Sequence, residues 1–232
     1  MPMRRTWWAW LGRSLFFGLM ALGVWMMVEA SISYLELGRH HPFFLGKLPL
    51  ARPKLWLGAL YLHVPSALFT LPACLVLLSK RVRSRVPRFH RWLGRVTGGL
   101  VLLAVVPSGL YLALFAPGGW ITTLGFWLTG LIAFGAMVKS IERARARDFR
   151  AHRRFSTHVA AQLSVAVFSR LMLIGAEELE LYSPWVYVAS LWVPVIGCAV
   201  VAELLAGRGL WSIAKGSRHE GLVTGSALDA AH

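Results

Sequence analysis

The chain has 232 residues, of which 56% are hydrophobic and 15% are charged, and its mean hydropathy is +0.58. Soluble domains are about 45–50% apolar and about 25% charged, so this composition excludes a disordered chain, a disulfide scaffold and an ordinary soluble globule. The formal net charge of +15 comes from 25 Lys and Arg residues against 10 Asp and Glu residues. Such a balance fits either nucleic-acid binding or the basic loops of a membrane protein.

Six apolar stretches are each long enough for a helix to cross the hydrocarbon core of a bilayer, which takes about 20 residues. None shows the strict alternation of a membrane β-strand, and a helix satisfies its own backbone hydrogen bonds in lipid. The sequence therefore predicts an all-α, polytopic membrane protein, built as a six-transmembrane-helix bundle. The predicted spans cover residues 14–35, 56–79, 93–116, 119–138, 155–176 and 184–206.

The positive charges divide unevenly between the two sides of these spans. Twenty of the 25 Lys and Arg residues fall in the N-terminal segment, the second and fourth connections and the C-terminal segment, which all lie on one side. Because such residues are enriched in cytoplasmic loops, both termini are predicted to be cytoplasmic, with the protein in the inner (cytoplasmic) membrane. This placement explains the charge without nucleic acid, and the basic loops are expected to attract anionic lipid headgroups.

The domain organisation is simple, since no internal repeat or second domain is visible. Residues 1–212 are predicted to form one membrane domain, and residues 213–232 a flexible cytoplasmic tail rich in Gly, Ser and Ala. Cys74 and Cys198 fall inside spans, where we expect them to act as small packing residues rather than as a disulfide.

Ionisable residues inside a membrane are costly, so each one requires a partner or a function. Glu29, His63 and Arg170 all lie roughly 9–10 Å below the predicted outer boundary, at a helical rise of about 1.5 Å per residue. This equal depth permits a Glu29–Arg170 ion pair with His63 beside it. Such a polar cluster would be either a structural pair that locks helix packing or a binding or proton-handling site that opens outward.

A second group of histidines lies near the cytoplasmic side. His90 opens the third span and His152 opens the fifth, with His158 nearly two turns further on. Neutral imidazole is the commonest protein ligand for metals, and two histidines from different helices can bind a haem iron axially. The alternative for each histidine alone is an interfacial side chain that is solvated among headgroups.

Two runs around these histidines resemble a known family. The first is His90-Arg91-Trp92-Leu93-Gly94-Arg95, and the second leads from Arg147-Asp148-Phe149 to His152-Arg153-Arg154-Phe155; His63, Lys80 and Arg170 accompany them. Together they resemble a family of bacterial predicted membrane proteins known as domain of unknown function 2306, over about residues 58–175. The family's usual Trp-Met after the second run is here Phe155-Ser156, and the family implies no activity.

The start of the third span is more distantly similar to the six-helix transmembrane cytochromes b that oxidise ascorbate, which have a His-Ser-Trp-x-Gly run there. Those proteins hold two haems on four histidines, whereas this chain offers only His63, His90 and His152 at similar positions, with His158 as a spare. The similarity therefore implies one haem b between His90 and His152 or His158. No Cys-x-x-Cys-His run is present, so covalent haem attachment is excluded.

These observations lead to two hypotheses about function. The first is a small redox subunit linked to a b-type haem or a quinone, with a membrane redox partner, in which His90 and His152 bind the haem iron. The second is a non-redox membrane protein, a small-solute carrier or an accessory or assembly subunit, that uses the outward cluster of Glu29, His63 and Arg170. In the first hypothesis the haem propionates or a similar anion would be neutralised by Arg91, Arg95, Arg153 or Arg154.

Overall fold

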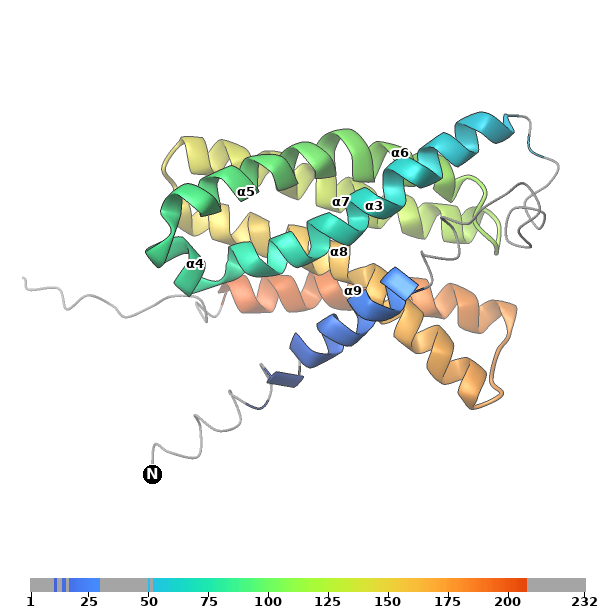
Figure 1. Ribbon diagram of the computed structural model, residues 1–232. Helices are drawn as coiled ribbons and strands as arrows, with labels where there is room; N and C mark the ends of the chain where they lie inside the picture. Colours follow the sequence, from blue (N-terminus) through green and yellow to red (C-terminus); the bar gives the residue numbers. More distant parts are fainter. Residues whose placement is uncertain (1–10, 12–13, 16, 30–49, 51, 208–232) are drawn as a thin grey trace, which may run out of the picture.

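The protein is an all-α bundle of long helices that lie roughly alongside one another (Figure 1). The computed structural model describes residues 11, 14–15, 17–29, 50 and 52–207. A short apolar helix, Phe17–Glu29, comes first. The remaining elements are α3 (Pro53–Leu78), α4 (Lys80–Arg85), α5 (Pro87–Leu100), the π-helical segment η1 (Val101–Val105), α6 (Val106–Ala113), α7 (Trp120–Arg145), α8 (Phe149–Glu178) and α9 (Pro184–Gly207).

Five helical stretches in the described part of the chain are long and apolar enough to cross a membrane. They match the second to sixth predicted spans, with α5, η1 and α6 forming one continuous span. At the basic side two helices extend beyond the predicted spans, since α7 continues to Arg145 and α8 already begins at Phe149. Of the first predicted span, residues 17–29 are helical and residues 30–35 lie outside the described residues. The predicted tail, 213–232, also lies outside them.

The helices pack mainly with their neighbours in the chain. α8 runs between α7 and α9 and packs closely along both, while α3 packs against α5, α6 and α8. The central core joins the side chains of Val101, Val106, Met137 and Val159, which are all buried. Large apolar side chains remain exposed on the outer faces, as expected for a bundle whose solvent is lipid.

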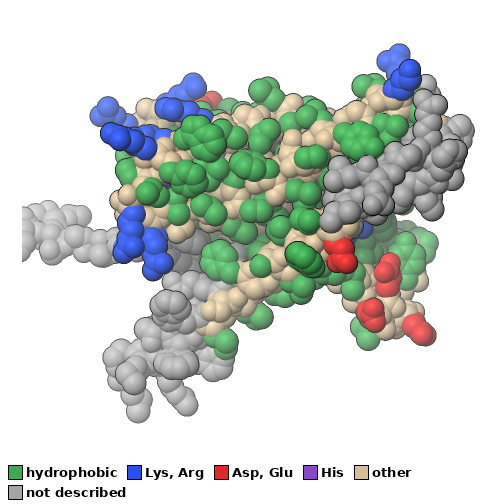
Figure 2. All heavy atoms as spheres, in the orientation of Figure 1, with side chains coloured by type: hydrophobic (Ala, Val, Ile, Leu, Met, Phe, Trp, Pro, Cys, Tyr) green, Lys and Arg blue, Asp and Glu red, His purple; other side chains and the backbone are tan. Residues whose placement is uncertain are grey.

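The two ends of the bundle differ in charge (Figure 2). One end, formed by α4, the start of α5, the end of α7 and the start of α8, carries clustered Lys and Arg side chains, and we call it the basic end. The opposite end includes the α8–α9 connection with Glu177, Glu178 and Glu180. This separation agrees with the predicted division of charge between the two sides.

The third span is irregular in its middle. The π-helical turn Val101–Val105 is followed directly by α6, where Pro107 occupies the second position and has no N–H to donate to the preceding turn. A π-turn inside an α-helix widens the backbone locally and frequently occurs at functional sites. It lies opposite His63 of α3, to which it presents a carbonyl group.

A buried polar link joins three helices in the middle of the bundle. The Thr129 hydroxyl of α7 donates to Gln162 Oε1 of α8 at 2.7 Å, and Gln162 Nε2 donates to the Val195 carbonyl of α9 at 3.5 Å. Gln162 is only 3% exposed. A polar side chain in this position holds α7, α8 and α9 in one register because no water is present to replace its partners.

Replacement of Gln162 by leucine is expected to destabilise the bundle by about 1 kcal/mol, since side-chain hydrogen bonds in membrane bundles contribute about 0.6 kcal/mol on average and two are lost. The free energy of unfolding, measured by titration of the detergent-solubilised protein with SDS, checks this value. Replacement of the exposed Leu131 by alanine serves as the control and should leave the titration midpoint nearly unchanged. A Gln162→Leu protein more stable than the wild type would show that the link is not structural.

Candidate functional site

The turn between α7 and α8 positions the first histidine of the candidate site. Arg147 has φ +60° and ends the turn, and Asp148 then caps α8 by accepting a hydrogen bond from the Ala151 amide at 3.0 Å. An aspartate at this position stabilises the first turn of a helix by satisfying an amide that has no helical partner. Its carboxylate also lies 3.7 Å from the Arg143 guanidinium of α7. His152 therefore lies in a first helical turn that Asp148 holds in place.

His152 points back at the end of α7. Its Nδ1 lies 2.9 Å from the Ser140 carbonyl oxygen and 3.0 Å from the Ser140 hydroxyl. A carbonyl can only accept, so Nδ1 carries the hydrogen and Nε2 has the free electron pair. The Ser140 hydroxyl is also 2.8 Å from that of Ser156, which lies one turn after His152. None of the hydrogen bonds described for the structure uses His152 Nε2.

His90 lies in the first turn of α5, at the same end of the bundle. Its Nδ1 is buried and has no hydrogen-bond partner among the described residues. His152 opens α8 at the same end, where a positive charge on it would act on His90, although α5 packs closely on α3 and α4 and not on α8. Both histidines thus lie at the basic end of the bundle, on separate helices.

Two arginines lie beside this pair without a carboxylate. Burial lowers the pKa of the Arg83 guanidinium in α4, and the nearby positive charge of Arg153 lowers it further. No ion pair to Arg83, Arg153 or His90 occurs within the ranges that the structure describes. Like charges held near one another without a counter-ion repel, so the Arg83 and Arg153 guanidinium groups are suited to an anion. Arg83 was not among the predicted site residues.

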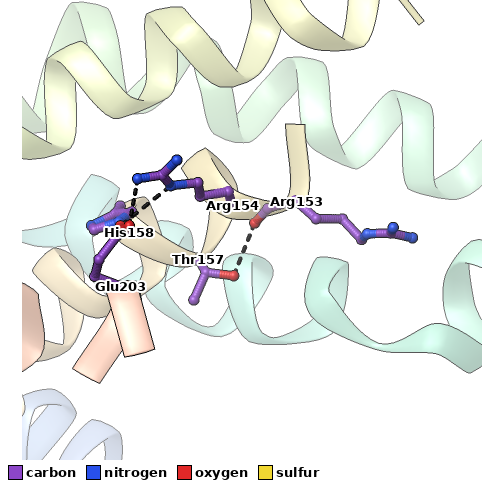
Figure 3. A network of polar contacts seen from close by, with 5 residues as sticks. All are labelled: Arg153, Arg154, Thr157, His158 and Glu203. Carbon is purple, nitrogen blue, oxygen red and sulfur yellow. Dashed lines mark hydrogen bonds and ion pairs between the residues drawn. The ribbon is translucent and has the colours of Figure 1, made fainter. Parts of the chain in front are cut away.

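Arg154, the next residue, is directed elsewhere (Figure 3). It forms a two-contact ion pair with Glu203 of α9, and His158 Nε2 lies 2.9 Å from the same carboxylate. Figure 3 shows Arg154 and His158 turned toward Glu203, whereas Arg153 points away from it. Arg154 therefore has its counter-ion within the protein. His158 also bonds to Glu203, and no contact between His158 and His90 or His152 is described.

Glu203 did not enter the predicted site, although the sequence contains a signal for it. It is the one acidic residue inside the sixth predicted span, 184–206, near the basic side. A carboxylate at that depth requires a partner. The other two predicted arginines, Arg91 and Arg95, are exposed at the basic end, and no ion pair is described for either.

His63 occupies a separate position, in the half of the bundle away from the basic end. Its Nδ1 donates to the Val105 carbonyl at 2.9 Å and lies 3.1 Å from the Ser108 hydroxyl. The ring packs on Gly109, where an added Cβ would come within 2.8 Å of His63 Cε1. The π-helical turn, Ser108 and Gly109 thus form a notch that holds one imidazole.

The predicted cluster of Glu29, His63 and Arg170 shows no ion pair among the described residues. Glu29 and Arg170 are both exposed on the surface of the described bundle. Equal depth along two helices leaves the rotation of each helix about its axis undetermined. No set of three or more His, Cys, Asp or Glu residues in the described ranges is arranged to hold a metal ion.

Comparison with known proteins supports the family resemblance and adds no activity. No curated protein and no solved structure is significantly similar to this chain, and nothing found supports the similarity to the cytochromes b. A family model described as predicted membrane protein (DUF2306) matches residues 60–206, from the middle of α3 to the end of α9. That match includes both histidine runs and most of the described bundle, so the chain belongs to the DUF2306 family of predicted membrane proteins.

Proposed function

We propose that this membrane protein is a small redox subunit that binds one haem b at its basic end, between His90 and His152. The observation that carries the proposal is the location of two histidines from separate helices at the same end as Arg83 and Arg153, two arginines that have no ion pair among the described residues. A haem requires these two features together, since it has axial positions on its iron and carboxylates at its edge.

The nitrogen atoms of the pair suit axial ligation. Histidines that bind metals usually donate Nδ1–H to a carbonyl or carboxylate, which fixes the tautomer and orients the ring. His152 has this arrangement through the Ser140 carbonyl. The buried Nδ1 of His90 has no hydrogen-bond partner among the described residues. Buried polar atoms nearly always have one, so this atom favours a bound group beside it.

The arginines would supply the second half of the site. Guanidinium groups pair with carboxylates through strong, charge-assisted hydrogen bonds. Arg83 and Arg153 are the first candidates for the propionates, and Arg91 and Arg95 are exposed at the same end. Arg154 is less suitable because Glu203 already neutralises it.

When bound, the haem would supply one-electron transfer, and the protein would orient and shield it. His152 is held by Asp148 and Ser140, and α7 and α8 provide the apolar wall behind it. We place the protein in the inner membrane with both termini and the basic end in the cytoplasm, on the positive-inside rule. There the basic loops would attract anionic lipids.

The geometry favours this proposal over a carrier or accessory subunit with an outward polar site. That alternative needed Glu29, His63 and Arg170 together, and no contact among the three is described, since His63 bonds to Val105 and both charged residues are exposed.

The test is the spectrum of the protein purified in a mild detergent from cells supplied with a haem precursor. We expect a dithionite-reduced minus oxidised difference spectrum of a low-spin b-type haem, with about one haem per chain by pyridine haemochrome assay. A colourless preparation that also takes up no added haemin would refute the proposal. Binding of inorganic phosphate by such a preparation would assign the cationic cluster to a different anion.

A further inference from the structure

A pocket of about 360 Å³ lies between α3 and α6, in the half of the bundle away from the basic end. A pocket of this size falls within the range of small-molecule sites. Its α3 residues recur at helical spacing along one face, so they form a continuous wall. The lining residues are Lys54, Leu55, Gly58, Ala59, Leu62, Ser108 and Tyr111.

The pocket has polar groups at different depths. Lys54 lies at the start of α3, whereas Leu62 is about 12 Å further along the helix at about 1.5 Å per residue. At that deeper level Ser108 lines the pocket, and its hydroxyl contacts His63, which follows Ala59 by one helical turn. The Tyr111 ring packs edge-on against Phe115, and none of the hydrogen bonds described for the structure uses its hydroxyl.

The pocket opens toward the lipid. Leu55 and Leu62 are about half exposed, and Gly58 between them has no atom within 4 Å of an added Cβ. A ligand that enters here comes from the bilayer and must itself be apolar over most of its length. The Ser108 hydroxyl and the His63 imidazole already bond within the bundle, so the deep lining residue left to bind a polar group of the ligand is Tyr111.

We propose that this pocket binds the ring of an isoprenoid quinone. A quinone combines an apolar tail with two carbonyl oxygens that accept hydrogen bonds, and the Tyr111 hydroxyl, which has no hydrogen bond among the described residues, is the deeper donor of the lining. A phospholipid differs, since its polar headgroup stays at the level of Lys54 and its acyl chains have no atom that uses a deep donor. In the proposed redox function the quinone would serve as the electron partner, and that role rests on the proposed function. Its binding, however, can be measured without any haem.

The test measures binding of a tritiated benzoquinone with a decyl tail to the full chain in phosphatidylcholine nanodiscs, corrected with empty discs. Gly58→Leu places a side chain in the open space of the pocket and is expected to weaken saturable binding at least tenfold. Gly135→Leu is the matched control, because Gly135 of α7 is also exposed with no atom near an added Cβ. It should bind as the wild type does.

Two further arms separate the ligand classes. Tyr111→Phe removes one hydroxyl and keeps the ring, so we expect weaker binding with an unchanged elution volume in size-exclusion chromatography. Unlabelled naphthoquinone should compete for the site, whereas phosphatidylglycerol should not.

Equal binding by Gly58→Leu and wild type, or competition by phosphatidylglycerol alone, overturns the proposal and assigns the pocket to ordinary lipid. A preparation that holds no haem and takes up no added haemin, yet binds the quinone saturably, overturns the proposed haem and leaves the quinone site standing. A protein that binds haem but shows no saturable quinone binding overturns the quinone site and leaves the proposed haem standing.

Discussion

Replacement of His152 by alanine is expected to abolish the b-type haem spectrum of the purified protein. The change removes a proposed axial ligand and leaves the Ser140 carbonyl without its imidazole donor. His90→Ala should have the same effect, because a low-spin b-type iron needs both axial histidines. The measurement is the haem-to-protein ratio of each variant, together with the position of the reduced α-band.

The matched control is His158→Ala, on the same helix and six residues further along. His158 bonds to Glu203 rather than to the pair, so its loss should leave the haem content unchanged. If His152→Ala retains haem and His158→Ala loses it, the ligand lies on the face of α8 that packs against α9. Full haem content in all three variants would remove the histidines of α5 and α8 from the ligand set altogether.

Replacement of Gly109 by alanine is expected to destabilise the bundle by about 1–3 kcal/mol, the typical cost of overpacking a fitted interior. The added Cβ would meet the His63 ring at 2.8 Å, and the ring cannot withdraw without losing the Val105 carbonyl. The free energy of unfolding in SDS titrations measures the effect.

The control for this prediction is Gly99→Ala, earlier in the same span, where no atom lies within 4 Å of an added Cβ. It should be neutral or slightly stabilising, since alanine favours helix over glycine. A double variant, Gly109→Ala with His63→Ala, should recover part of the loss because the clashing ring is gone. Additive effects of the two substitutions would show that the notch does not hold the imidazole.

The family motif illustrates how far sequence reasoning reaches. The Arg147-Asp148-Phe149 run could be recognised in the sequence as part of the family motif. The structure explains two of its residues, since Asp148 caps α8 and Arg147 adopts a positive φ. The location of His90 and His152 at the same end of the bundle was predictable because both histidines open helices on the basic side. Which arginines accompany them was not, because Arg153 and Arg154 are neighbours in the sequence yet point to opposite sides of α8.

The sequence alone determined that this protein is an α-helical membrane protein and located five of its long helices, because hydropathy and the lengths of apolar runs are properties of the chain read in one dimension. It also separated the charged ends. The contacts of His63, Glu203 and Gln162 were decided by the tertiary structure alone. They depend on the rotation of each helix about its axis and on close approaches at single residues such as Gly109, and these follow only when the helices pack against one another.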